Sequence, residues 1–359
     1  MWPPLSIIWV NYNSIGIMDI VLRSLKSVLE LEYPDYEVIV VDNASSDGSF
    51  ERIRDFVKER ARDRRPIIKI LRLPMNKSYD GGVNEGFKAR DRSSKYVIAM
   101  NNDIIVFPET LKVLVETAEL SGKIGAINGI LLSYWKPTVI DSAGGVISEL
   151  LIPGILFSGK SINRVMTGRL YSVTYAEASL ALYNIKAVLE VNEGLEILYE
   201  PWTIAYYDDV VISLKLWGKG YMSLVCSKAI GLHGRSQTFK ALGLGPTLLY
   251  IATRNRIALN EITNSRSKSI IRTLMIKRVL RYPKARLVKA LRRGLELGRL
   301  LKAIGLQLDL YKAPIAYVTR REAIKALFGS LSKVGMRAHN RFEEKVLRIL
   351  SGDQMRCDL

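Results

Sequence analysis

Apolar and polar positions in the first hundred residues follow two alternating periods. Short runs of branched apolar residues, typical of strands buried on both faces, occur at Ser6–Val10, Glu37–Val41, Ile67–Leu71 and Tyr96–Met100. Between the first two runs, apolar residues recur at helical spacing from Ile17 to Leu29. Strands that alternate with helices predict a parallel sheet with right-handed crossovers. We therefore expect an α/β fold.

The pattern is less regular after the fourth run. Glycine-rich pairs within residues 124–174 indicate hairpins, or antiparallel strands at a sheet edge. Tyr175–Tyr183 and Gly220–Val225 are predicted as further strands. A helix is predicted between these two strands, with Asp208 and Asp209 at its N-terminus. Negative charge is favoured there by the unpaired backbone amides, so a capping role is the alternative to chemistry for this pair.

The net charge of +18 is distributed unevenly along the chain. Residues 1–240 contain 28 Lys and Arg against 27 Asp and Glu, whereas residues 241–359 contain 25 against 8. The first part resembles an ordinary soluble domain, and the second is suited to an anionic surface. We therefore predict two domains, a catalytic domain at residues 1–240 and a basic amphipathic helical region at residues 241–359.

The composition also excludes several protein classes. A hydrophobic content of 48% is enough for a substantial core, which excludes a disordered chain. Cys226 and Cys357 are too few for a disulfide framework or a zinc site, which fits a reducing compartment. The N-terminus lacks the basic flank of a signal peptide, and no apolar run reaches the roughly 18 residues of a membrane span. The expected location is therefore the cytoplasm.

Polar residues directly follow the predicted strands. Asn11 and Tyr12 follow the first strand, Asp42 follows the second, and Asn101–Asp103 follow the fourth. Ligands of open α/β sheets bind at the carboxyl ends of strands, where a carboxylate can hold a divalent cation beside a phosphate. A turn without chemistry is the alternative for each segment. The Gly81-Gly82 pair, with a helix expected to start behind it, permits close approach of the backbone to a phosphate.

Six short segments occur in order along residues 5–240. They are VNYNS at 10–14, VDNASSDGS at 41–49, NKSYDGGVNEG at 76–86, NND at 101–103, YYDDV at 206–210 and the histidine of LHGRS at 232–236. Together they resemble the inverting family 2 glycosyltransferases of the GT-A fold, in particular the rhamnosyltransferase-like enzymes of polysaccharide biosynthesis. This resemblance implies a mixed, mainly parallel sheet flanked by helices. It also implies transfer of a sugar from a nucleotide-diphosphate donor to a glycan or lipid-linked acceptor by single displacement.

The same resemblance implies three sets of site residues. The nucleotide-sugar donor would be bound by residues at the strand ends and in the glycine-rich segment: Asn11, Tyr12, Asp42, Asn76, Gly81, Gly82, Asn84, Asn102 and Asp103. Asp103 would hold a divalent cation, Mg²⁺ or Mn²⁺, and His233 would help to hold this metal or the diphosphate. Asp209 would act as the general base on the acceptor hydroxyl. Asp80 stands where the family usually has a small residue, which leaves the donor sugar open.

The basic region after residue 240 has two interpretations. Apolar residues at helical spacing among many cations fit a helix lying on an anionic membrane, which residues 265–359 would bind at the inner face of the cell membrane. The alternative is a helical subdomain that packs its apolar stripe on the catalytic domain. We expect Arg254-Asn255-Arg256, near the start of this region, to face the acceptor or its phosphate.

Two other functions compete with glycosyl transfer. A sugar nucleotidyltransferase would need a glycine-rich and basic pyrophosphate loop after the first strand, where this chain has Asn11–Ser14. A non-catalytic protein that binds nucleic acid would use the basic region on phosphates. Aromatic residues are sparse in that region and no motif for reading nucleic acid occurs, so we expect no nucleic-acid partner.

Overall fold

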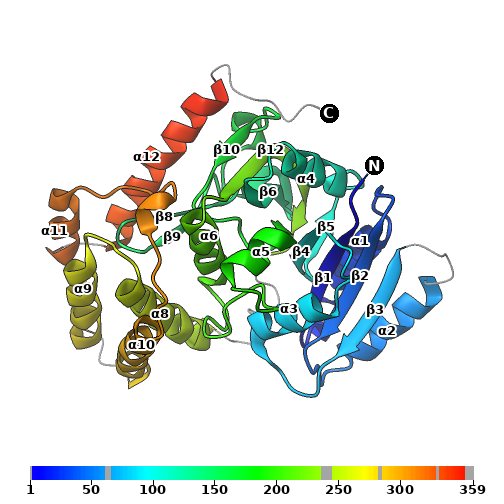
Figure 1. Cartoon of the computed structure of the whole chain (residues 1–359), viewed down its shortest axis with the longest axis horizontal. Helices are drawn as coiled ribbons and strands as arrows, with labels where there is room; N and C mark the ends of the chain where they lie inside the picture. The colour runs from blue at the N-terminus through cyan, green and yellow to red at the C-terminus, as the bar shows by residue number, and fades with distance from the viewer. Residues whose placement is uncertain (1, 61–65, 236–244, 282–284, 329–330, 352–359) are drawn as a thin grey trace.

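The computed structural model describes residues 2–60, 66–235, 245–281, 285–328 and 331–351 (Figure 1). A ten-stranded sheet has the order β10-β12-β6-β11-β4-β1-β2-β3, with β5 paired to β12 and β7 paired to β6. Parallel and antiparallel pairs both occur, and helices flank the sheet (Figure 1). The predicted α/β class is confirmed.

The N-terminal part of the sheet is parallel. The strands β1 (Leu5–Asn11), β2 (Tyr36–Asp42), β3 (Ile67–Arg72) and β4 (Tyr96–Asn101) correspond to the four predicted runs. In the register, Asn11 lies opposite Asp42, and Val10 lies opposite Asn101. The carboxyl ends of three neighbouring strands are therefore level, and their polar residues share one edge of the sheet.

Helices α1 (Met18–Leu29), α2 (Ser49–Arg60) and α3 (Ser78–Ala89) flank this part of the sheet, whereas α4 (Thr110–Glu119) packs on β6 and β12 in the second part (Figure 1). The prediction that a helix starts behind Gly81-Gly82 is wrong, because both glycines lie inside α3. A Cβ on Gly82 would lie 3.1 Å from Cγ1 of Val10, and one on Gly86 would lie 2.4 Å from Cγ2 of Ile8. These glycines therefore let α3 pack closely on β1.

The second part of the sheet is mixed. It contains β5 (Ile104–Val106), β6 (Ile124–Ser133), β7 (Lys136–Ser142), β10 (Leu170–Ser172), β11 (Leu180–Asn184) and β12 (Met222–His233), while β8 (Gly145–Ile147) and β9 (Pro153–Ile155) form a separate hairpin. The last two predicted strands had wrong bounds. β11 is shorter than predicted because residues before Leu180 form a turn, and β12 is longer because it pairs with both β6 and β5.

α5 (Ile185–Val191) and α6 (Asp208–Gly218) follow β11, so Asp208 and Asp209 do begin a helix. Helices α8 (Gly245–Ile262), α9 (Lys268–Arg281), α10 (Ala285–Ala303), α11 (Arg320–Phe328) and α12 (Leu331–Ser351) complete the described chain. Figure 1 shows α8 to α11 at the opposite side of the molecule from α2 and β3.

The C-terminal helices share a core with the sheet. One apolar cluster includes Val146, Leu150 and Val211 together with Leu259 and Ile271. The predicted apolar stripe therefore packs on the rest of the protein. The predicted domain boundary at residue 240 lies outside the described residues, as does Cys357, whereas Cys226 is buried. Among the described residues, none of the helices combines the length and apolar content that crossing a bilayer requires.

Candidate functional site

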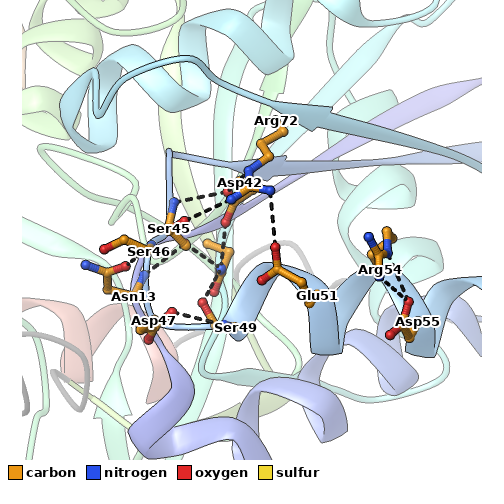
Figure 2. Close-up of polar contacts among 11 residues, drawn as sticks. Asn13, Asp42, Ser45, Ser46, Asp47, Ser49, Glu51, Arg54, Asp55 and Arg72 are labelled. Atoms are coloured by element: carbon orange, nitrogen blue, oxygen red, sulfur yellow. Dashed lines mark hydrogen bonds and ion pairs between the residues drawn. The ribbon is translucent and has the colours of Figure 1, made fainter.

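A hydrogen-bond network joins the ends of β1, β2 and β4. Nδ2 of Asn11 donates to Oδ1 of Asp42 at 3.0 Å, and Oδ1 of Asn11 accepts from Nδ2 of Asn102 at 3.0 Å. The other carboxylate oxygen of Asp42 accepts the backbone N–H of Ser45 at 3.1 Å and lies 3.7 Å from Nε of Arg72 (Figure 2). The structure therefore brings Asn11, Asp42 and Asn102 together, and all three are buried.

The other residues expected at the donor have different surroundings. Tyr12 is half-buried directly after β1, and Asn76 is exposed, with its Oδ1 accepting the backbone N–H of Ser78 at 2.7 Å. Asn84 is buried and bonds to the backbone groups of Leu198 and Tyr199. Asn84 therefore holds the segment before α6.

Sequence reasoning missed Asn43, which follows Asp42. Its Oδ1 accepts the backbone N–H of Lys77 at 2.8 Å, and its Nδ2 donates to the carbonyl of Ser78 at 2.6 Å. Asn43 thereby fixes the start of α3 next to the end of β2. Its place in the segment VDNASSDGS was the available signal.

Asp103 meets His233 because β5 and β12 pair antiparallel, with His233 opposite Ile104. Nε2 of His233 lies 3.3 Å from Oδ1 of Asp103, and the backbone N–H of Gly234 donates to the carbonyl of Asp103 at 2.9 Å. On the other side of the ring, Nδ1 of His233 lies 2.8 Å from Oδ2 of Asp141 in β7. Burial opposes a charge on this ring, but Asp103 and Asp141 outweigh it and raise the pKa of His233 to about 10.

These residues fit a divalent cation. Nε2 of His233 is buried and has no well-oriented hydrogen-bond partner, despite its short distance to Asp103. A carboxylate on the far nitrogen of a histidine is how proteins orient metal-ligating imidazoles, and Asp141 has that place. Among the described residues, no group of three or more His, Cys, Asp or Glu side chains is arranged to hold a metal. If Asp103 and His233 held a cation, they would leave most of its shell to a ligand such as a diphosphate.

A second group of carboxylates surrounds the N-terminus of α6. Oδ1 of Asp209 accepts the backbone N–H of Val210 at 2.8 Å, and its Oδ2 accepts that of Ala178 at 3.3 Å. Burial, followed by the charges of Asp208 and Glu177, raises the pKa of Asp209 well above its ordinary value. Burial also raises the pKa of Asp208, to about 6. Carboxylates in this state bind protons more strongly than exposed ones.

Arg235 and Glu177 link the two groups of acidic residues, and sequence reasoning missed this link. Arg235 forms an ion pair with Asp141, which holds His233. Burial opposes the charge of Arg235, but the hydrogen bond to Asp141, followed by the charge of Glu177, outweighs burial and raises the pKa of Arg235. The charge of Glu177 also contributes, after burial and Asp208, to the raised pKa of Asp209. Arg235 was visible in the segment LHGRS, but no spacing signal marks Asp141 or Glu177.

Comparison with known proteins was consistent with this geometry. The family described as Glycosyl transferase family 2 matches residues 6–204. A poly-beta-1,6-N-acetyl-D-glucosamine synthase of Staphylococcus epidermidis is 32% identical over 106 residues, which are 30% of this chain and 24% of that protein. The succinoglycan biosynthesis protein ExoO of Rhizobium meliloti is 25% identical over 36% of this chain and 33% of its own length. The chain thus spans less than half of each of these relatives.

Two solved structures show the same fold. GalNAc-T7 with UDP, GalNAc and Mn²⁺ has a TM-score of 0.57 and 14% identity over 86% of this chain and 58% of that one. TarS residues 1–349 of S. aureus, in complex with UDP-GlcNAc, has a TM-score of 0.50 and 16% identity over 97% and 90%. At these identities the likeness is one of fold, and that fold is GT-A.

Proposed function

This chain belongs to glycosyl transferase family 2, and from that premise we propose that it moves a sugar from a nucleotide-diphosphate donor to a glycan or lipid-linked acceptor with inversion. Family membership favours this function over a sugar nucleotidyltransferase and over a nucleic-acid-binding module. The observation that carries the proposal is the level edge of β1, β2 and β4, where Asn11 and Asp42 are joined by a hydrogen bond and Asp103, after β4, lies 3.3 Å from Nε2 of His233.

The donor would bind along this edge. Asp42 and Asn11 offer polar groups for the nucleobase or ribose beside Tyr12, and Asn76, Gly81, Gly82, Asn84 and Asn102 would shape the rest of the pocket, as the family resemblance implies. Asp103 and His233 would hold Mg²⁺ or Mn²⁺ against the diphosphate. When bound, such a cation neutralises the negative charge that develops on the leaving diphosphate.

Asp209 would act on the acceptor. The acceptor oxygen forms a bond to the anomeric carbon as the bond from that carbon to the phosphate oxygen breaks. The electron pair leaves with the diphosphate, and the hydroxyl proton passes to Asp209. Attack from the face opposite the leaving group inverts the anomeric centre. Burial and the charges of Asp208 and Glu177 raise the pKa of Asp209, which strengthens its affinity for the hydroxyl proton in this role.

The test is a screen of nucleotide sugars with Mg²⁺ and with Mn²⁺, in which the release of nucleoside diphosphate is measured. We expect turnover of at least one donor, and we expect Asp103→Asn to abolish it and to weaken metal-dependent nucleotide binding. Asp19→Asn, at a side chain that is 77% exposed on α1, is the matched control. A Asp103→Asn variant as active as this control, or no turnover of any donor, would contradict the proposal.

We further propose that the C-terminal helices bind an anionic membrane surface. Beside their many cations, α9 and α11 expose Leu280 and Phe328, which are 74% and 83% exposed, and Ile304, directly after α10, is 71% exposed. An apolar side chain that enters a membrane interface next to basic residues gains both hydrophobic and electrostatic free energy. The protein would then be peripheral on the inner face of the cell membrane.

This second proposal is tested with vesicles containing phosphatidylserine and with neutral vesicles. The variant replaces Lys289, Arg299 and Lys302, all exposed on α10, with Glu, and its control carries the same change at Lys26, Lys58 and Lys88. We expect only the α10 variant to lose sedimentation with anionic vesicles. Equal binding of the two variants would exclude α10 as the membrane-binding element.

A further inference from the structure

The chain enters α6 through a segment with unfavourable backbone conformations. Ile204, Tyr206 and Tyr207 have φ angles of +68°, +64° and +68°. In this left-handed region Cβ crowds the backbone, so such conformations persist only where surrounding contacts hold them. The next residues are Asp208 and Asp209. Whatever holds residues 203–207 therefore also sets the direction of these two carboxylates.

One side chain of α8 contacts three backbone carbonyls of this segment. Nδ2 of Asn255 lies 2.7 Å from the carbonyl oxygen of Thr203, 2.8 Å from that of Tyr206 and 3.2 Å from that of Ala205, and it donates to them. Asn255 is fully buried, so its amide has no water to replace these carbonyls. The side-chain amide of Asn255 thus donates its hydrogens to the segment before α6.

Arg254 fixes the direction of the Asn255 amide. Its Nε and Nη2 donate to Oδ1 of Asn255 at 2.9 and 2.6 Å, which leaves Nδ2 directed to the segment. Nη2 of Arg254 also donates to the carbonyls of Trp202 and Thr203. The third residue, Arg256, donates to the carbonyl of Leu150. These contacts overturn the expectation that the triplet Arg254-Asn255-Arg256 faces the acceptor.

α8 is in turn supported by α10. A Cβ on Gly294 would lie 2.7 Å from the carbonyl oxygen of Arg254, and one on Gly298 would lie 3.0 Å from that of Ala258. There is no room for a side chain at either position, so α10 lies directly against the turn of α8 that carries Asn255. α10 thereby supports α8, whose Asn255 holds the segment that leads to Asp208 and Asp209.

We propose that Asn255 is a positioning residue that aims Asp209 at the acceptor hydroxyl, with Arg254 as the residue that orients it. The part of this inference that concerns the acceptor hydroxyl rests on the proposed function. Among the described residues, the side-chain hydrogen bonds of Asn255 go to Arg254 and to residues 203–206 rather than to the ends of β1, β2 and β4, so its loss should slow turnover and leave donor binding nearly unchanged.

The test compares full-length Asn255→Ala with Asn260→Ala. Asn260 is on the same helix, equally buried, and donates to the carbonyl of Lys268 rather than to the segment. For Asn255→Ala we expect kcat to fall about 100-fold, the loss typical of a displacement of about 1 Å, and the donor KM to change by less than about threefold. For Asn260→Ala we expect kcat to stay within about twofold of wild type.

Hydrogen exchange gives a readout that does not depend on turnover. Amides of residues 203–210 should exchange faster in Asn255→Ala than in Asn260→Ala. Equal exchange and equal kcat in the two variants, or a loss of activity carried entirely by KM, would overturn the inference. If Asn255→Ala fails to fold, Arg254→Lys decides in its place, because it keeps the charge and loses the planar fork. An inactive wild type would instead refute the proposed function. The exchange comparison would still show whether Asn255 holds the segment before α6.

Discussion

Two groups of carboxylates in this protein have opposite surroundings. At the strand ends, Asp42 faces donors from Asn11 and Ser45, and Asp103 faces the ring of His233. Around the N-terminus of α6, carboxylates face one another instead. In the part of the chain that the structure describes, no ion pair with Lys, Arg or His involves Asp80, Asp208 or Asp209.

This difference separates two kinds of chemistry. A carboxylate that hydrogen-bond donors hold at a strand end can attract a cation, as a metal site requires. A buried carboxylate next to like charges binds a proton more strongly, as a general base requires. Asp80 belongs to the second kind, since burial and the charge of Asp208 raise its pKa. This difference supports the proposal that one edge of the sheet binds the donor and that proton transfer takes place at the start of α6.

The largest expected effect is that of Asp209→Asn. The amide keeps the shape of the side chain but cannot accept a proton, so we expect kcat to fall by roughly a thousandfold, within the range known for general bases. Donor affinity should change little, because the donor edge is formed by other residues. Steady-state kinetics with the donor found in the screen measures both values. An Asp209→Asn enzyme with more than about a tenth of wild-type kcat would contradict the role of Asp209 as the general base.

A smaller effect, a loss of metal affinity, is expected from Asp141→Asn, which tests the carboxylates at the strand ends. This change weakens the contact that orients His233 and leaves Arg235 with a poorer partner. Removing such a supporting carboxylate typically lowers metal affinity about 10–100-fold. Titration with Mn²⁺ in the presence of a nucleoside diphosphate measures the change. Asp55→Asn, at a side chain that is 57% exposed on α2, is the control, and equal affinities in the two variants would contradict a metal role for His233.

The two groups also differ in how far the sequence predicted them. β1, β2 and β4 are continuous apolar runs, so the positions of Asn11, Asp42 and Asp103 at one edge followed from local pattern and the rule for parallel strands. Asp208 and Asp209 were correctly placed at a helix start for the same local reason.

The contacts that complete each group come from distant parts of the chain. Asp141 reaches His233 only because β7 pairs with β6 and β6 with β12, and Asn255 reaches Thr203 from a separate helix. Neither pairing leaves a periodic signal. The bounds of β12 were wrong for the same reason, because partners in the sheet extend a strand beyond its apolar run.

Stability should respond in opposite directions at the two groups. Asp42→Asn places an amide NH₂ where the carboxylate now accepts from Asn11 and Ser45, so one buried donor loses its acceptor. We expect the free energy of unfolding to fall by about 1–3 kcal/mol. Urea unfolding at pH 7 measures this value, with Asp55→Asn again as the control. An unchanged unfolding free energy would show that Asp42 is not held by its donors.

The smallest expected effect has the opposite sign. Asp208 is buried and its pKa in the folded protein is raised to about 6, above the value of 3.8 expected for the unfolded chain. The folded state therefore binds more protons between pH 4 and 6, and the stability of the wild type should fall as pH rises through that window. Asp208→Asn removes this titration, and because Asn loses some backbone contacts the net gain at pH 7 should be only about 1 kcal/mol.

Urea unfolding of Asp208→Asn and wild type at several pH values between 4 and 7 measures both the gain and the slope. The gain should shrink towards pH 4, where the wild-type carboxyl is protonated in the folded state and begins to be protonated in the unfolded state. A variant that is less stable than wild type at pH 7, as Asp42→Asn should be, would show that backbone contacts outweigh burial and repulsion at Asp208. The contrast between carboxylates stabilised by hydrogen-bond donors and carboxylates destabilised by burial and repulsion would then fail, because donors would stabilise both groups.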